Sequence, residues 1–468
     1  MLQLFDTARG QVVPFETREP GKVSMYVCGP TVYGPPHLGH GRFSLVFDVL
    51  RRYLTWSGYE VTYVSNVTDI DDKIIERSRN ENRPAEEIAR RCEKVWWKGM
   101  DGIGVERPTH DPHATAYVEQ MVAFIGELLA AGKAYETDDG VYFSAETVPD
   151  YGLLARQSLD SLEAGARVEV DADKRAPIDF ALWKKSKTDG SGKPDEPSWP
   201  SPWGAGRPGW HTECVVMSLD LLGDGFDLHG GGQDLAFPHH ENERAQAVAL
   251  GHTFARHWMH NGFVEVGGEK MSKSLGNFDN LLDLIQSSDP RAYRLLVLRS
   301  HYRSPVEVTG STADDASAAL RRLDTFVRRA GELAPGQPED DQLDEFRRLM
   351  DDDLNTPGAV SLLFTLVRRG NQALDADDDA GAADILATVR QIAEAVGLGL
   401  AAPGAAGEGD DGDPAGPGVS PEAGALATQR DQARTAKEWA RADQLRDQLV
   451  ALGYVVEDTA DGTQIRRA

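Results

Sequence analysis

The sequence has no hydrophobic run that approaches the ~18 residues needed to cross a membrane, so no membrane-spanning segment is expected. Cysteine is scarce: the three residues, Cys28, Cys92 and Cys214, are widely spaced and odd in number. This usage argues against a disulfide framework and favours a reducing compartment. Asp6 and Arg9 place charge too early for a secretion signal. We therefore expect a cytoplasmic protein.

Basic residues are in deficit, with 49 Lys and Arg against 75 Asp and Glu and a net charge of −26. This balance alone argues against a protein that binds nucleic acid. The excess acid is unevenly distributed, because residues 401–427 hold five acids and no base, whereas residues 291–306 hold four arginines and no acid. The arginines of residues 291–306 could therefore form a basic surface that binds nucleic acid. Arginine pairs, however, usually lie on solvated helix faces.

Residues 22–67 have the pattern of a βαβ unit. Residues 22–29 are apolar enough for a buried strand, residues 43–54 place their apolar side chains on one helical face, and residues 59–67 form a second strand pattern. Such a unit predicts a right-handed crossover between parallel strands. The segment between its first strand and its helix therefore lies where open α/β sheets bind ligands.

That segment, CGPTVYGPPHLGH from Cys28 to His40, holds two histidines around a glycine. At the amino end of a helix, free backbone N–H groups favour phosphate. We therefore expect His37 and His40 to bind a phosphate-containing substrate. The alternative is that they are two surface histidines without a function.

A second stretch, EKMSKSLGN at residues 269–277, places Lys270 and Lys273 three positions apart in a glycine-flanked segment. This composition predicts a mobile loop. Its lysines suit a polyphosphate, because they can neutralise the charge of a leaving group. A Lys-x-x-Lys pair by itself occurs in many loops, so the pattern gains weight only together with His37 and His40.

Four residues form a candidate metal site. His239 and Glu243 are four positions apart and share a face if the segment is helical, and Cys28 and Cys214 adjoin other motifs. Two thiolates, one imidazole and one carboxylate suit Zn²⁺. The spacing alone does not single out this set, because buried cysteines are often inert and further ligands compete. The competitors are His211, His240 and Glu241.

The length of 468 residues predicts about three domains at ~150 residues each. The expected fold class is α/β: a split, Rossmann-like domain with a parallel sheet, interrupted by an insertion and followed by an α-helical bundle and a small α+β tail. The predicted parts are the first half of the catalytic domain at 1–112, a connective insertion at 113–205, the second half at 206–311, a helical bundle at 312–400, a flexible acidic linker at 401–425 and the tail at 426–468.

These motifs together resemble the class I aminoacyl-tRNA synthetases, whose two signatures match HLGH at 37–40 and KMSKS at 270–274. Within that class the chain is similar to the cysteinyl-tRNA synthetase family. The stretches that carry this similarity are CGPTVYGPPHLGH, NVTDIDDKI (66–74), GWHTEC (209–214), GGGQDLAFPHHENE (230–243) and MDDDLNTPGA (350–359). The similarity covers nearly the whole chain apart from the acidic linker.

The resemblance implies a cysteine–tRNA ligase activity, in which L-cysteine reacts with ATP to cysteinyl adenylate and is transferred to the 3′-terminal ribose of tRNA(Cys). It implies Mg²⁺ with the ATP and one Zn²⁺ per chain that binds the substrate thiolate. A thiophilic ion separates cysteine from serine better than size can, because one small group is worth only ~1–3 kcal/mol. The implied zinc ligands are Cys28, Cys214, His239 and Glu243, and the implied catalytic residues are His37, His40, Lys270 and Lys273.

The same resemblance implies further contacts. The amino-acid pocket would contain Thr68, Trp210 and Asp234, although Trp210 could equally be a core aromatic and Asp234 could cap the following turn. A monomer is expected, with the bundle and the tail holding the tRNA. The implied ATP-binding residues are His37, His40, Lys273, Gly230, Gly231 and Gly232.

Two other functions share parts of this pattern. A ligase that joins cysteine to an aminosugar in mycothiol synthesis shares the metal site and both signatures but lacks a full tRNA-binding carboxyl region. A non-catalytic RNA-binding relative would have lost the chemistry, which the intact HLGH and KMSKS motifs oppose. Interleaved acids in the tail leave open a merely solvated amphipathic helix. The tail arginines that are candidates for phosphate contacts are Arg430, Arg434, Arg441 and Arg446.

Overall fold

The computed structural model describes residues 1–157, 174–187, 196–266, 280–400, 421–436, 438–452, 454–459 and 462–467. These residues form two compact units, 1–401 and 402–468, and each unit is considered by itself. Within the described ranges, no helix is long and apolar enough to traverse a lipid bilayer. The motif lysines Lys270 and Lys273 lie outside the described residues.

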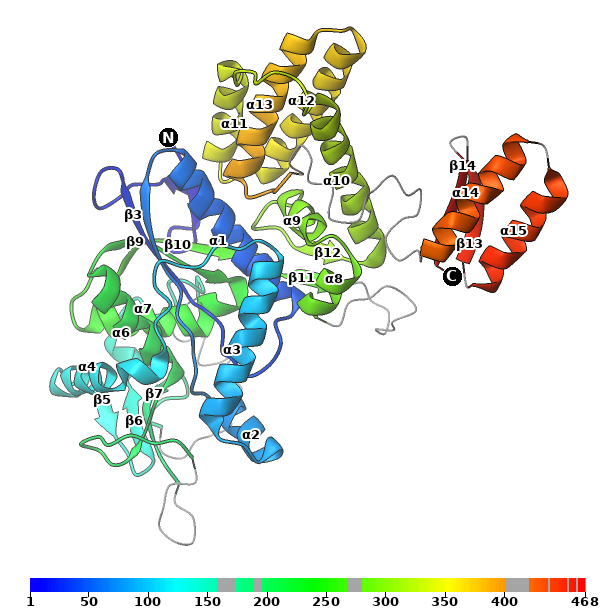
Figure 1. The fold of residues 1–468 in the computed structure, drawn as a ribbon. Helices are drawn as coiled ribbons and strands as arrows, with labels where there is room; N and C mark the ends of the chain where they lie inside the picture. The colour runs from blue at the N-terminus through cyan, green and yellow to red at the C-terminus, as the bar shows by residue number, and fades with distance from the viewer. Residues whose placement is uncertain are drawn as a thin grey trace. The chain divides into compact units, whose positions relative to one another are not determined.

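A four-stranded parallel sheet forms the centre of the first unit, in the order β10-β9-β3-β4 (Figure 1). The first part of the chain supplies β3 (Lys22–Val27) and β4 (Glu60–Val64), and the later part supplies β9 (Phe226–Gly232) and β10 (Ala255–Asn261). β3 pairs with β4 on one side and with β9 on the other. The split parallel sheet expected from the sequence is confirmed.

Helix α1 (Leu38–Trp56) connects β3 to β4 and completes the predicted βαβ unit. Its side chains Leu45, Phe47 and Leu50 are fully buried. The helix begins at Leu38, before the first apolar position of the sequence pattern, because His37 caps its first turn.

Shorter elements surround the sheet, including a hairpin of β1 (Gln3–Asp6) and β2 (Gln11–Pro14) at the amino end. A 3₁₀ turn, η3 (Gln233–Leu235), and a π-helical turn, η4 (Ala236–His240), join β9 to α7. The helices of this region are α2 (Asp72–Glu81), α3 (Ala85–Gly102), α6 (Trp210–Leu222), α7 (Glu241–Ala249), α8 (Leu281–Ser287) and α9 (Pro290–Leu298). The short strands β11 (Val264–Val266) and β12 (Val306–Val308) form a parallel pair.

The insertion forms an antiparallel sheet in the order β5-β6-β7-β8. This sheet encloses a separate hydrophobic cluster that includes Phe143, Leu182 and Trp183. β8 lies just beyond residue 205, the predicted end of the insertion, because it pairs with β7. The elements of the insertion are η1 (Ala114–Tyr117), α4 (Val118–Ala130), β5 (Ala134–Glu136), β6 (Gly140–Phe143), η2 (Ala145–Thr147), β7 (Phe180–Lys185) and β8 (Gly206–Pro208).

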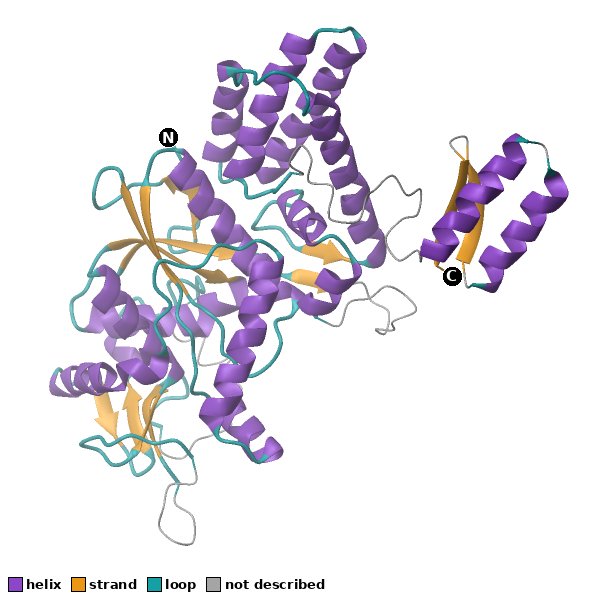
Figure 2. Ribbon diagram, in the orientation of Figure 1, coloured by secondary structure: helices purple, strands orange, loops and turns teal. Residues whose placement is uncertain are grey.

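Four helices follow (Figure 2). Their buried side chains belong to the same hydrophobic cluster as those of α1. Phe326, Phe346 and Leu363 belong to the same hydrophobic cluster as Phe47 and Leu50 of α1. The bundle is therefore anchored on the helix that begins at the HLGH motif. Its helices are α10 (Gly310–Ala330), α11 (Asp340–Asp351), α12 (Thr356–Asp375) and α13 (Asp379–Ala395).

The second unit packs two helices against an antiparallel hairpin. The sequence predicted one helix and the hairpin; the additional helix begins at Pro421, so the linker predicted over 401–425 ends by residue 420. Proline suits the first helical turn. Arg430, expected to face phosphate, is instead buried and donates to Thr463 Oγ1 at 2.6 Å, which holds the helix to the hairpin. The elements are α14 (Pro421–Thr435), α15 (Trp439–Ala451), β13 (Tyr454–Thr459) and β14 (Gly462–Arg467).

Candidate active site and metal centre

A cleft of about 500 Å³ lies at the carboxyl edge of the parallel sheet. Cys28 follows β3, Gly232 ends β9 and Asn261 ends β10, and all three line this cleft. The chain leaves β3 toward β4 on one side and leaves β9 toward β10 on the other. This divergence of neighbouring strands creates the ligand crevice of open α/β sheets. Further lining residues are Tyr33, His37, His40, Lys73, Trp210, Asp234 and Phe263.

His37 and His40 cap the amino end of α1 together. The Nδ1 of His37 accepts from the backbone N–H of His40 at 3.3 Å, and the Nδ1 of His40 accepts from the backbone N–H of His37 at 3.2 Å. The two rings stack with centroids 3.6 Å apart. Because each Nδ1 is an acceptor, the proton of each neutral ring is on Nε2. Both rings therefore carry an N–H donor beside the first turn of α1.

Neither ring is charged near neutral pH. Burial lowers the pKa of His40 to about 3, and His37 and Lys73 add to this shift. Burial also lowers the pKa of His37, although Asp234 opposes the shift. The pair therefore suits phosphate as neutral dipoles, which add to the free N–H groups of the helix end.

Cys28, Cys214, His239 and Glu243 come together beside this cleft. The two Sγ atoms are 3.6 Å apart, and Cys28 Sγ is 3.4 Å from Glu243 Oε1. His239 Nε2 is 3.6 Å from Cys214 Sγ and 3.0 Å from Glu243 Oε1. All four residues are at most 3 % exposed. The predicted common face of His239 and Glu243 is confirmed, across the junction of η4 and α7.

These separations fit a tetrahedral ion. Ligands at about 2.0–2.3 Å from zinc lie roughly 3.3–3.8 Å from one another. Three of the four separations given above, at 3.4–3.6 Å, fall in this range, and the His239–Glu243 pair is slightly closer at 3.0 Å. Without a cation, ionisation of the buried thiols is unfavourable. Burial and then Cys214 raise the pKa of the Cys28 thiol well above its usual value. Burial likewise raises the pKa of Cys214. A divalent cation reverses this cost, since it stabilises both thiolates.

Two residues hold the ring of His239. His211 Nδ1 is 2.9 Å from His239 Nδ1, which leaves His239 Nε2 directed at the ligand group. The Trp210 ring stacks on His239 with centroids 3.9 Å apart. Trp210 is 37 % exposed and lines the cleft, so it is not a core aromatic. Of the competing ligands, His211 therefore lies behind His239, and Glu241 is paired with Arg244 at 3.1 Å.

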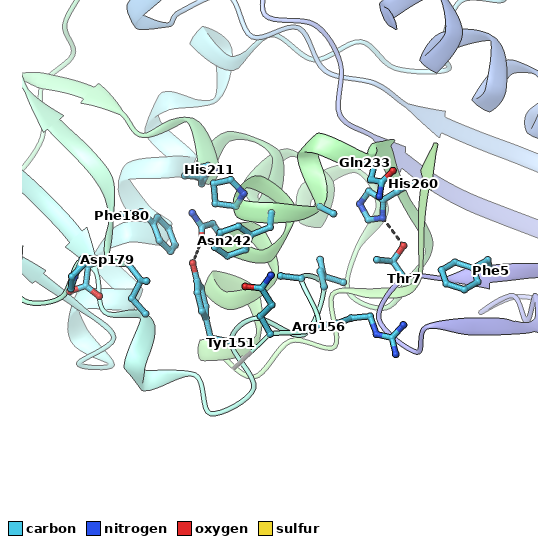
Figure 3. A pocket seen from close by; sticks show the side chains of 18 of the residues that line it. Phe5, Thr7, Tyr151, Arg156, Asp179, Phe180, His211, Gln233, Asn242 and His260 are labelled. Carbon is cyan, nitrogen blue, oxygen red and sulfur yellow. Dashed lines mark hydrogen bonds between the residues drawn. The ribbon is translucent and has the colours of Figure 1, made fainter. Parts of the chain in front are cut away.

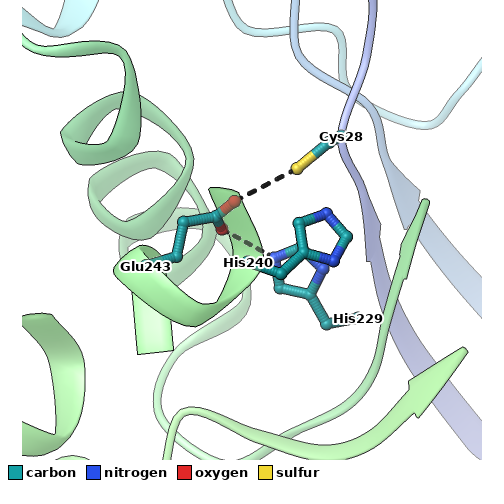
Figure 4. A group of neighbouring side chains, drawn as sticks. All are labelled: Cys28, His229, His240 and Glu243. Carbon is teal, nitrogen blue, oxygen red and sulfur yellow. Dashed lines mark hydrogen bonds and ion pairs between the residues drawn. The ribbon is translucent and has the colours of Figure 1, made fainter. Parts of the chain in front are cut away.

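The third competitor, His240, belongs to a second group of potential ligands that overlaps the first. Cys28 and Glu243 also lie close to His229 and His240 (Figure 4). His229 Nε2 is 2.7 Å from Glu243 Oε2, and His240 Nδ1 is 2.8 Å from His260 Nε2. The second group contains one thiol where the first contains two. Because thiolates favour Zn²⁺, the chemistry favours the first group.

Thr68, expected in the amino-acid pocket, is buried and is not among the described residues that line the cleft. Its hydroxyl donates to Glu213 Oε2 at 2.7 Å and accepts from Asn66 Nδ2 at 3.2 Å. Asn66 Oδ1 also accepts from the Gly29 N–H at 2.9 Å, which ties this network to the end of β3. Sequence reasoning missed Asn66 and Glu213, because their contacts join parts of the chain that no spacing rule connects.

The residues around the end of β9 differ in their surroundings. A side chain on Gly230 would collide with the ring of Phe47, and one on Gly231 would collide with His240, so packing alone requires both glycines. Gly232 and Asp234 line the cleft. Neither η3 nor η4 shows a side-chain cap, so Asp234 does not have the capping role that the sequence left open.

Lys73 is a cleft residue that sequence reasoning missed. Its Nζ lies 4.9 Å from the centroid of the Tyr33 ring, and its charge contributes to the low pKa of His40. Lys73 lies in the stretch NVTDIDDKI that carries part of the family similarity, but it was not proposed as a site residue. The placement of Lys270 and Lys273, which lie outside the described residues, stays a prediction.

A second cavity of about 880 Å³ is lined in part by Gln233 and Ala236 (Figure 3), whereas their neighbours Asp234 and Leu235 line the cleft. Its lining includes His211 and His260 from the surroundings of the ligand group and Tyr151 from the insertion. Thr7 Oγ1 is 2.7 Å from His260 Nδ1 on this side. The candidate metal centre therefore lies between the cleft and this cavity.

Three family models match successive parts of the chain. Residues 14–318 match "tRNA synthetases class I (C) catalytic domain", residues 345–401 match the DALR domain, and residues 416–466 match "Cysteinyl-tRNA ligase anticodon binding domain". The first match contains every site residue proposed from the sequence.

Curated relatives match along the whole chain. The cysteine–tRNA ligase of Halorhodospira halophila is 46 % identical over 469 residues, which is 100 % of both chains. That of Streptomyces avermitilis is 44 % identical over 463 residues, which is 98 % of each.

Solved structures share the fold at low identity. The methionyl-tRNA synthetase of Mycobacterium tuberculosis with methionyl-adenylate has a TM-score of 0.56 at 15 % identity, over 80 % of this chain and 89 % of that one. An Agrobacterium radiobacter LeuRS in a ternary complex with tRNA and LeuAMS has a TM-score of 0.61 at 12 % identity, over 82 % and 85 %.

Proposed function

The chain belongs to the family of cysteine–tRNA ligases within the class I synthetases, and we propose that its site joins L-cysteine to tRNA(Cys) with ATP. The observation that carries this proposal is the buried group of two thiols, an imidazole and a carboxylate beside a cleft that begins at His37 and His40. The cleft suits a nucleotide, and the group beside it suits a metal that recognises a thiol.

The reaction needs positioning and charge stabilisation rather than a covalent enzyme intermediate. The cysteine carboxylate attacks the α-phosphorus of ATP in line, and pyrophosphate leaves. A hydroxyl of the terminal ribose of the tRNA then attacks the carbonyl of the adenylate, and AMP leaves. The Nε2–H groups of His37 and His40 bind phosphate oxygens at the end of α1. Lys270 and Lys273 stabilise the departing pyrophosphate, and Mg²⁺ accompanies the ATP.

We assign Cys28, Cys214, His239 and Glu243 as the ligands of one Zn²⁺ per chain. Held by these four residues, the ion would supply a thiophilic centre for the substrate sulfur and would favour its thiolate at neutral pH. His211 keeps the ring of His239 turned toward the thiols. The pocket thereby recognises sulfur instead of size, which separates cysteine from serine by more than the ~1–3 kcal/mol of one small group.

The remaining residues shape the substrate site. Trp210 covers His239 from the cleft, and Thr68 fixes the wall behind Cys214 through Glu213. Gly232 and Asp234 face the substrates in the cleft. The bundle and the second unit hold the tRNA. We place the reaction in the cytoplasm, with the chain acting as a monomer.

The metal assignment is tested by Cys214→Ser, with His240→Ala as the matched variant from the overlapping group. We expect Cys214→Ser to release the metal and to weaken cysteine binding at least tenfold, whereas His240→Ala keeps the metal. Elemental analysis and cysteine-dependent ATP–pyrophosphate exchange provide the two measurements. Metal-free wild-type protein with full activity would contradict the assignment, and metal loss from His240→Ala alone would move it to the overlapping group.

The substrate assignment is tested by charging. The intact chain is expected to attach labelled cysteine to tRNA(Cys) in an ATP-dependent manner. The aminosugar ligase hypothesis predicts instead that the chain ignores tRNA and consumes ATP with cysteine and an aminosugar. The match of residues 416–466 to an anticodon-binding domain supports the first outcome.

A further inference from the structure

Helix α1 carries a buried arginine in its second turn, two residues after His40. Arg42 is only 1 % exposed, and its guanidinium donates to four backbone carbonyl oxygens of two other segments. One acceptor is the oxygen of Phe263, and the other three lie in residues 301–304. Among these, the oxygen of Tyr302 is 3.2 Å from Nη2. One side chain therefore joins the helix of the HLGH motif to two segments that lie far from it in the sequence.

The first of these segments is a wall of the cleft. Residues 262–264 line the same cleft as the HLGH motif. Their backbone passes so close to residues 303–304 that a side chain on Gly262 would collide with two carbonyl oxygens there. Because Arg42 donates to both segments where they meet, it fixes the place of this wall relative to the first turn of α1.

Arg42 differs from the other buried arginines in its lack of a counter-charge. Its acceptors are carbonyl oxygens, and its Nε atom has no hydrogen-bond partner among the described residues. Each of the other buried arginines described in the first unit pairs with a carboxylate. These are Arg207, Arg244 and Arg294.

The charge of Arg42 is retained despite its burial. Burial lowers the pKa of Arg42 to about 10, so the side chain remains protonated near neutral pH. A buried charge without a counter-ion is costly, and the four carbonyl dipoles offset only part of that cost. An anion in the neighbouring cleft would lower the cost further. The cleft is the proposed site of ATP, whose triphosphate is such an anion.

We propose that Arg42 is a positioning residue for ATP, which holds the cleft wall of residues 262–264 against the HLGH helix and has the triphosphate as its counter-charge. This inference rests on the proposed function, since it requires ATP in the cleft. Arg42 is not among the described residues that line the cleft. It therefore acts through the backbone of Phe263 and does not contact the reacting atoms.

Arg42→Gln removes the charge and most of the hydrogen bonds that hold the wall. We expect the KM for ATP in pyrophosphate exchange to rise roughly 10–100-fold, because the wall and the HLGH motif lose their fixed separation. Cysteine binding at equilibrium and the metal content should stay unchanged, since Arg42 contacts none of the proposed metal ligands. A loss of ATP affinity alone is a result that a general loss of stability does not produce.

The matched control is Arg294→Ala. Arg294 is also 1 % exposed, but its guanidinium donates to Asp48 and to carbonyl oxygens outside residues 262–264. This variant should be less stable than the wild type and should keep its KM for ATP within about twofold. The comparison separates the placement of the cleft wall from the stability of the first unit.

Arg42→Lys keeps the test informative if Arg42→Gln does not fold. A lysine keeps the charge but lacks the planar fork that spans several carbonyl oxygens, so its KM for ATP should also rise, by less than in Arg42→Gln. A wild-type KM for ATP in either variant overturns the role of Arg42, and so does an equal loss of ATP and cysteine binding. A wild-type chain without cysteine-dependent ATP–pyrophosphate exchange overturns the proposed function itself.

Discussion

The Nδ1 atoms of His37 and His40 are committed to the backbone of α1, and this commitment fixes what the two rings can do. Each neutral ring has its only N–H at Nε2, so it can orient a phosphate oxygen but cannot neutralise it. Neutralisation falls to cations, for which Lys270 and Lys273 are the proposed residues. In this site, the histidines therefore orient the phosphate, and the lysines stabilise the leaving group.

The neutral state of His40 leads to a prediction about pH. His40→Ala is expected to slow ATP–pyrophosphate exchange roughly 10²–10³-fold, the usual effect of losing one preorganised donor. Because burial lowers the pKa of His40 to about 3, the ring gains no proton as the pH falls from about 8 to about 6. The wild-type rate should therefore not rise over that interval. An acid-side gain in the rate profile that disappears in His40→Ala would identify a catalytic imidazolium instead.

Lys273 is one of the two lysines proposed to stabilise the leaving pyrophosphate. Lys273→Ala is expected to slow adenylate formation roughly 10²–10³-fold and to change cysteine affinity little, because its charge matters most as pyrophosphate departs. Pyrophosphate exchange and equilibrium cysteine binding separate the two effects. An exchange rate within about threefold of wild type would exclude an electrostatic role of that size.

At the residue scale, the sequence showed which residues are suited to the site better than it showed which residues contact one another. The four-residue spacing of His239 and Glu243 predicted their common face. Cys28 and Cys214 were proposed because they adjoin other motifs, and the family resemblance then singled out this set of four from its competitors. The sequence named His211 as a competing metal ligand, and the structure instead places its ring behind His239, with the two Nδ1 atoms 2.9 Å apart.

At the scale of elements, α1 links the site to the rest of the first unit. Its first turn holds the two histidines, and its middle carries the buried Asp48. Asp48 Oδ2 accepts from Arg294 Nη1 of α9 at 2.6 Å. Arg294 also donates to the carbonyl oxygens of Ile103 and Val396, at the ends of α3 and α13. One guanidinium therefore joins four helices behind the cleft.

Arg294→Ala is expected to lower the free energy of unfolding of the first unit by about 3–5 kcal/mol, because a buried ion pair loses one partner. Asp48 keeps its contact with Arg52 at 2.8 Å, which limits the loss. Arg348→Ala is the matched control, since Arg348 forms an exposed pair with Glu345 and should be dispensable. Urea denaturation of both variants provides the comparison. Equal midpoints for the two variants would mean that Arg294 contributes no more than a surface arginine.

Local sequence patterns predicted helices and strands well where a single hydrophobic periodicity continued without interruption. The βαβ unit of β3, α1 and β4 is confirmed. The start of α1 was placed too late, because its cap is a pair of histidines instead of the usual short polar residues. Helix α14 was missed, because its first turn adjoins a Gly- and Pro-rich acidic stretch that hides it.

At the scale of the whole molecule, one strand pairing creates the site. β9 lies beside β3, although β4, α2, α3 and the insertion separate them in the chain. This pairing brings Cys28 and Gly232 to one edge of the sheet and explains why ligand spacing along the sequence did not reveal the metal group. Which strand pairs with which depends on packing across the whole first unit, and the sequence pattern does not encode that choice locally.

Residues 421–468 belong to a compact unit separate from the one that holds the cleft. The described residues of 421–468 form their own hydrophobic clusters, and the clusters around the cleft lie within 1–401. Deletion of residues 421–468 should therefore leave pyrophosphate exchange nearly intact. It should raise the KM for tRNA and flatten the salt dependence of tRNA binding, by about 0.9 in the logarithmic slope for each lost phosphate contact.

A point-variant version of this experiment avoids the deletion. Arg441 and Arg446 are exposed on α15, so replacing both with Ala should weaken tRNA binding most at low salt, because the lost contacts are electrostatic. Arg430→Ala, in contrast, should destabilise the second unit, since Arg430 is buried against Thr463. If the deletion leaves the KM for tRNA and its salt dependence unchanged, the second unit does not contact the tRNA, and α15 is a solvated amphipathic helix.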